Sequence, residues 1–162
     1  MKLHFRKATE ADVPQMVEML ANDKLGQQRE AYADPLPETY YKAFRNIDKD
    51  SNQELMVIED EDHTVIGTLQ LSFIQYLTYR GGLRAQLEAV RIKEGYRGKG
   101  IGATVFKWAI ARAREKGAHL IQLTTDKKRP EAVKFYEKLG FSATHEGMKL
   151  HFKEMHEAGL GE

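Results

Sequence analysis

Apolar residues recur along the chain with two different periods. Where apolar and polar residues alternate, or where short runs are apolar and rich in β-branched residues, the pattern predicts strands. These are expected at residues 2–7, 55–59, 64–75, 83–92, 119–124, 141–144 and 147–152. Where apolar residues lie three and four positions apart, the pattern predicts amphipathic helices. These are expected at 10–21, 38–48, 100–116 and 130–139.

The links between these elements indicate how the strands pair. Residues 22–37 carry Gly26, Pro35 and Pro37 among polar residues and are expected to form a loop. The three middle strands are joined by the charged turn 60–63 and by Gly81-Gly82, which are too short for a crossover. Three consecutive antiparallel strands follow. The order of elements therefore predicts an α/β fold with a mixed, partly antiparallel sheet.

Composition narrows the classes of protein. The chain has 162 residues and a mass of 18.6 kDa, with 25 Lys and Arg against 24 Asp and Glu, a net charge of +1. We expect one domain over 1–162 that buries about 70% of its unfolded surface. The near-neutral charge argues against nucleic acid or membrane partners held by bulk charge. The chain has no cysteine, so thiol catalysis and disulfides are excluded.

Two further expectations come from what the sequence lacks. It shows no secretory leader and no apolar run of membrane-spanning length, which favours a cytoplasmic protein. Its six histidines have no metal-ligand spacing, so no metal is expected.

The densest chemical signal is the turn Arg97-Gly98-Lys99-Gly100-Ile101-Gly102, which follows a predicted strand and opens a long predicted helix. Glycines let a ligand approach the backbone, and the free N–H groups of a first helical turn attract anions. A phosphate group fits this turn, to which Arg97 and Lys99 add positive charge. Two alternatives stay open. In the first, the glycines serve only the conformation of a tight turn. In the second, the string from Gly98 is a dinucleotide-binding fingerprint, with Asp126 as the acidic residue that binds the ribose. The preceding antiparallel strands disfavour the doubly wound sheet that this second alternative needs.

Taken from Arg97, the string is R-x-x-G-x-G, and here the sequence resembles the GNAT superfamily of N-acetyltransferases. The resemblance includes residues 87–92, 96–102 and 132–141, in the family's order and spacing. It implies the GNAT fold, a mostly antiparallel sheet of about six to seven strands with about four helices. It also implies a splayed strand pair that holds acetyl-CoA.

The same resemblance implies where acetyl-CoA binds. Its pyrophosphate would lie on the backbone of residues 97–102, and its pantetheine arm beside the strand at Val90 and Ile92. The Ile92 N–H would donate to the thioester carbonyl. Where the family commonly has an asparagine that contacts pantetheine, this chain has Arg129. That arginine either reaches the coenzyme phosphates or is solvated at the helix start.

Two side chains are candidates for the chemistry of acetyl transfer. An alkylammonium of pKa about 10 must lose a proton before it can attack, so a carboxylate base is useful. Glu88 lies where many family members carry such a base, and two-residue alternation predicts that it shares a strand face with Val90 and Ile92. Its alternative is a structural pair with Arg84 or Arg91.

Tyr136 matches the family's Phe-Tyr pair and is the candidate acid, or the group that positions the sulfur. On helical spacing alone it would be a core residue.

The acceptor is expected to be a primary amine of a small molecule or peptide, attacked directly in a ternary complex. No spacing identifies that amine, and the oligomeric state stays open, with a homodimer among the options. The alternative from another class is a non-catalytic acyl-CoA-binding sensor or regulatory module.

Overall fold

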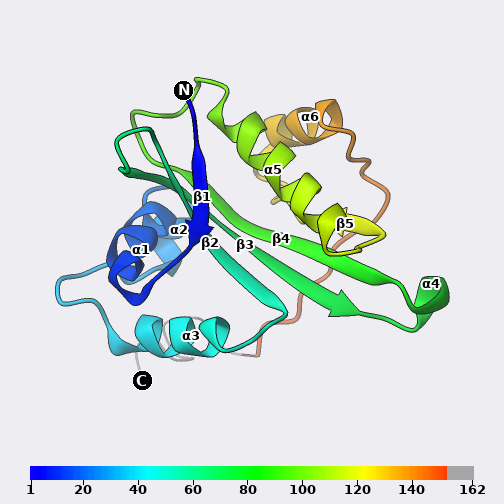
Figure 1. Ribbon diagram of the computed structural model, residues 1–162, viewed down its shortest axis with the longest axis horizontal. Coiled ribbons are helices and arrows are strands. Elements are labelled where there is room, and N and C mark those ends of the chain that lie inside the picture. The colour runs from blue at the N-terminus through cyan, green and yellow to red at the C-terminus, as the bar shows by residue number, and fades with distance from the viewer. Residues whose placement is uncertain (153–162) are drawn as a thin grey trace.

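The protein is described here by a computed structural model covering residues 1–152, and its centre is one five-stranded sheet in the order β1-β2-β3-β4-β5 (Figure 1). The first three neighbouring pairs are antiparallel and β4–β5 is parallel. The strands are β1 (His4–Lys7), β2 (Gln53–Glu59), β3 (Val65–Gln75), β4 (Leu83–Ile92) and β5 (Leu120–Gln122).

Helices cover both faces of this sheet. The 3₁₀ turn η1 (Glu10–Asp12) leads into α1 (Val13–Ala21), followed by α2 (Gly26–Arg29), α3 (Glu38–Asp48), α4 (Thr78–Gly81), α5 (Ile101–Glu115) and α6 (Pro130–Lys138). In Figure 1, α5 and α6 lie on one side of the sheet and α1, α2 and α3 on the other. The short α4 is a left-handed turn at the tip of the β3–β4 hairpin, with Tyr79 and Arg80 at positive φ.

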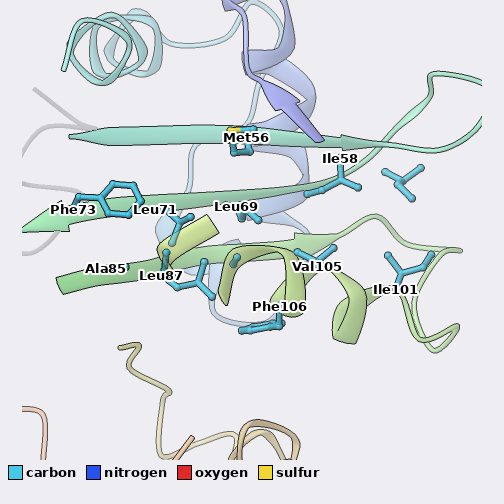
Figure 2. Close-up of a cluster of buried hydrophobic side chains, with 13 residues drawn as sticks. Met56, Ile58, Leu69, Leu71, Phe73, Ala85, Leu87, Ile101, Val105 and Phe106 are labelled. Atoms are coloured by element: carbon cyan, nitrogen blue, oxygen red, sulfur yellow. The ribbon is translucent and has the colours of Figure 1, made fainter. Parts of the chain in front are cut away.

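Two apolar clusters join these layers. On the α5 side, Val105 and Phe106 pack on strand residues such as Leu71 and Leu87, as Figure 2 shows, and Ala109 belongs to the same buried cluster. On the other side, buried residues of α1 and α3 pack against the sheet around Val57 and Val65. Both follow from sequence pattern, because a helical stripe of apolar residues is stabilised only when a sheet face covers it.

Most of the predicted elements are confirmed, with bounds that differ by a few residues. The predicted strands at 141–144 and 147–152 are wrong: residues 141–152 pair with no strand of the sheet. The described sheet therefore has five strands rather than six or seven. The period of two is present at Met148, Leu150 and Phe152, but these side chains are 82–95% exposed. Alternation forms a strand only where a neighbouring strand supplies hydrogen bonds and a surface to bury one face.

The loop over 22–37 also differs from expectation, because α2 forms one short helical turn within it. The doubly wound sheet that a dinucleotide-binding fingerprint would need is not present in residues 1–152, where β4–β5 is the one parallel pair.

Candidate active site

The site begins where β4 and β5 separate. The two strands pair only between residues 84–86 and 120–122, so the rest of β4 has an open edge. Lys93 donates its backbone N–H to Ile66 O on β3 at 2.7 Å, so the preceding residue points its backbone groups to the open edge. Arginine side chains bind the carbonyls there: Arg91 Nη1 donates to Val90 O and Arg97 Nε to Ile92 O, each at 2.9 Å.

The glycine-rich turn lies at the end of this edge and opens α5. Gly98 and Gly100 have φ of +77° and +76°, which L side chains rarely adopt, and a Cβ at either would meet no atom within 4 Å. Gly100 is the N-cap of α5 and no side chain caps that end. The first N–H groups of the helix therefore have neither an intrahelical partner nor a side-chain cap, which suits an anion.

The two cations of the turn have different surroundings. Arg97 is held back toward the protein, because its guanidinium also donates to Asn22 O at 3.2 Å. Lys99 is exposed, with its Nζ 5.7 Å from the centre of the Tyr96 ring. Ile101 is buried in the α5-side cluster, and Gly102 lies near Phe135, whose Cζ would be 3.8 Å from a Cβ on the glycine.

A β-bulge changes the face on which the β4 side chains lie. Thr68 pairs with Arg91 and Gln70 with Glu88, so one residue of β3 opposes two of β4. Ala89, in the bulge, has a φ of +54°. The prediction that Glu88 shares a face with Val90 and Ile92 is therefore wrong.

The bulge separates these side chains into two groups. Ala85, Leu87, Val90 and Ile92 all pack with the α5-side cluster. Glu88 and Arg91 lie together on the opposite face, because their partners Gln70 and Thr68 are two positions apart on one strand.

Glu88 is exposed, and a chain of amides orients its carboxylate. Gln122 Nε2 of β5 donates to Gln86 Oε1 at 2.7 Å, and Gln86 Nε2 donates to Glu88 Oε1 at 2.9 Å. The alternative pairing with Arg84 or Arg91 is not seen among the ion pairs of residues 1–152. Arg84 instead lies over the Tyr76 ring, 4.3 Å from its centre.

Tyr136 of α6 is half-buried and packs against the α5-side cluster, with its ring 5.5 Å from that of Phe106. Burial raises the pKa of the Tyr136 phenol, while the positive charges of Arg129 and Arg91 and a hydrogen bond with Thr125 act in the opposite direction. The phenol therefore stays protonated at neutral pH and is able to donate a hydrogen bond. The core contact that helical spacing predicts is present, and the role of Tyr136 in the chemistry stays a prediction.

Sequence reasoning missed the charged group beside Tyr136. Asp23 of the α1–α2 loop has its Oδ2 3.0 Å from Arg91 Nε and 3.3 Å from Arg129 Nη2. Arg129 is therefore not simply solvated but ion-paired to this loop, and its contact with the coenzyme phosphates stays a prediction. No local spacing links residues 23, 91 and 129, so only the fold brings them together.

A shallow hollow of about 500 Å³ lies elsewhere, lined by Glu10, Ala11, Glu38, Tyr41 and Arg45. It contains none of the predicted site residues. None of the helices in residues 1–152 is long and apolar enough to cross a membrane.

The sequence profile described as the Acetyltransferase (GNAT) family matches residues 17–141, which contain the open β4 edge, the glycine-rich turn and Tyr136. The chain belongs to this family. Members of the GNAT family use acetyl-CoA.

Two curated relatives of this GNAT chain are N-acetyltransferases. Aminoalkylphosphonate N-acetyltransferase of Salmonella typhimurium is 28% identical over 111 residues, which is 65% of this chain and 70% of the relative. Glucosamine 6-phosphate N-acetyltransferase of Trypanosoma brucei brucei is 30% identical over 86 residues, 53% of this chain and 56% of the relative.

Solved structures show the same GNAT fold. A protein of Bacillus halodurans C-125 described as a transcriptional regulator is 54% identical, with a TM-score of 0.89 over 93% of this chain and 100% of that one. A predicted acetyltransferase of Clostridium acetobutylicum, solved with acetyl-CoA, has a TM-score of 0.70 at 23% identity over 93% of this chain and 96% of that one.

Proposed function

We propose that this protein transfers an acetyl group from acetyl-CoA to the primary amine of a small molecule or peptide, by direct attack in a ternary complex. The observation that carries the proposal is the open edge of β4 leading to the uncapped N-terminus of α5. The open edge of β4 offers backbone groups to a coenzyme, and Glu88 lies on the face of the sheet opposite the α5-side cluster.

The residues present fit the coenzyme. A diphosphate needs several N–H donors and no side chain in the way, and the turn over residues 97–102 offers both, since the positions of the missing Cβ atoms of Gly98 and Gly100 are open. Val90 and Ile92 would present backbone groups to the pantetheine arm, and the Ile92 N–H would donate to the thioester carbonyl. Acetyl-CoA supplies the activated acetyl group.

Glu88 is proposed as the general base. At neutral pH the acceptor amine is almost wholly protonated, and only its neutral form attacks a carbonyl. A carboxylate at the open edge attracts the ammonium and takes its proton, directly or through a water molecule. The hydrogen bond from Gln86 fixes Glu88 Oε1 and leaves Oε2 for this task.

Tyr136 is proposed as the acid that serves the departing sulfur. Because burial raises the pKa of its phenol above the ordinary value, the hydroxyl is a good hydrogen-bond donor but a reluctant proton donor. The pKa of a thiol lies near 8.5, so complete transfer of the proton from the phenol to the departing thiolate is unfavourable in free energy until the product leaves. The environment thus favours a phenol that holds the sulfur and stabilises its negative charge.

A second candidate function is a non-catalytic acyl-CoA sensor. The relative from Bacillus halodurans at 54% identity is described as a transcriptional regulator, which favours a regulatory role. Such a module would keep the coenzyme site and have no use for Glu88 or Tyr136.

Release of free CoA from acetyl-CoA, measured across a panel of amines, separates the two functions. The enzyme is expected to release CoA in the presence of at least one amine, and Tyr136→Phe is expected to bind acetyl-CoA normally but turn over slowly. Tight acetyl-CoA binding without turnover on any amine would favour the sensor. Binding of NADH but not acetyl-CoA would contradict both.

A further inference from the structure

The charged group beside Tyr136 has more positive than negative charge. One carboxylate, Asp23, lies between the guanidinium groups of Arg91 and Arg129. The nearby Arg29 and Glu30 pair with each other at 2.8 Å and do not change the balance. Among the described residues, this group therefore carries an excess of one positive charge.

Arg91 is incompletely hydrogen-bonded for a largely buried charged group. Its side chain is 17% exposed, and burial lowers its pKa. Arg91 Nε and Asp23 Oδ2 lie 3.0 Å apart, yet among residues 1–152 neither atom makes a hydrogen bond of good geometry. A guanidinium has five N–H donors, and Arg91 uses one of its terminal nitrogens on Val90 O. A buried charge in this state favours an additional anion.

The position of this charge relative to Glu88 limits the ligand. Because of the bulge, Glu88 and Arg91 lie on the same sheet face, opposite residues of β3 that are two positions apart. Two positions along a strand correspond to about 7 Å. The positive charges of Arg91 and Arg129 also lower the pKa of the Tyr136 phenol, against the effect of burial.

From this arrangement we infer that Arg91 and Arg129 form an anion subsite for the acceptor, which is a short amine carrying a phosphonate, phosphate or carboxylate group. Glu88 receives the ammonium end and the two arginines receive the anionic end, two to three carbons away. This inference rests on the proposed acetyl transfer and names its substrate class. Asp23 holds both arginines in place before the acceptor arrives.

The test compares two amines of similar length, 2-aminoethylphosphonate and propylamine, at a pH where both amines are largely protonated. The wild type is expected to prefer the phosphonate in kcat/KM. Arg91→Gln and Arg129→Gln are each expected to reduce that preference by about tenfold, through KM for the phosphonate, because each removes a charge-assisted contact. The constants for propylamine should change much less than those for the phosphonate.

Lys128→Gln is the matched control, since it removes the same charge from an exposed residue next to Arg129. An equal loss in this variant would mean that only long-range attraction is at work and would overturn the subsite. Weaker acetyl-CoA binding in the arginine variants, with the amine preference intact, would assign the arginines to the coenzyme phosphates instead. If Arg91→Gln does not fold, Arg129→Gln carries the test, because its side chain is 37% exposed.

Calorimetric titration with the same two amines keeps the subsite separate from the proposed function. Binding of 2-aminoethylphosphonate that is lost in Arg129→Gln, without turnover of any amine, would support the subsite and contradict acetyl transfer. Turnover of propylamine with no preference for the phosphonate would support acetyl transfer and overturn the subsite.

Discussion

Replacing Gly100 by alanine separates a coenzyme-binding role of the glycine-rich turn from a purely conformational one. Gly100 has a φ of +76°, and a Cβ there would meet nothing within 4 Å. Left-handed backbone costs an L residue about 1–2 kcal/mol, so Gly100→Ala should lower Tm by about 2–8 °C in a domain of this size. Because the Cβ would occupy the space in front of the α5 amides, the variant should also bind acetyl-CoA about tenfold more weakly or worse, through the loss of a charge-assisted hydrogen bond.

Gly117, just beyond the other end of α5, is the matched control. It has a φ of +85° and equally open surroundings, so Gly117→Ala should lose similar stability. It should keep the wild-type affinity for acetyl-CoA. Thermal unfolding and calorimetric titration of the two variants give both quantities. Equal affinity in Gly100→Ala and Gly117→Ala would refute the reasoning and leave the turn with a conformational role only.

Three further predictions concern the side chains of the site and of the core. Tyr136→Phe should reduce kcat with little change in acetyl-CoA affinity, measured by CoA release and calorimetry; an unchanged kcat would remove Tyr136 from the chemistry. Glu88→Gln should slow the reaction most at low pH, where the amine is protonated, so a pH–rate profile that overlays the wild type would contradict its role as base. The ion pair between Glu54 and Arg112, with contacts of 2.6 and 2.8 Å, lowers the pKa of the Glu54 carboxyl. Its contribution of about 2 kcal/mol is therefore fully present above the unfolded-state pKa and is lost as pH falls below about 5. Denaturant unfolding should show Glu54→Gln converging with wild type in acid, and a difference that does not change with pH would contradict this.

Local patterns were sufficient to predict the elements that carry the site. The strand over 83–92 and the helix starting after Gly100 were predicted from the spacing of their apolar residues and from the glycines that bound them. The glycines between the two elements also predicted the turn that joins them. Pattern failed at 141–152, where the alternation is present but no strand pairs with it.

The arrangement of the side chains in the site was less predictable. Two-residue alternation put Glu88 on the face of Val90, and the bulge at Ala89 reverses this. A bulge depends on how two strands pair and leaves no spacing in one strand that would reveal it. The contacts of Asp23 with Arg91 and Arg129 join three distant parts of the chain, which no local pattern reports.

A crystal structure of the protein with coenzyme A tests the central claim most directly. The account predicts that the diphosphate oxygens accept hydrogen bonds from the backbone N–H groups of residues 98–102, with the pantetheine arm along the open edge of β4. Coenzyme bound elsewhere on the molecule, with the start of α5 in contact only with solvent, would contradict it.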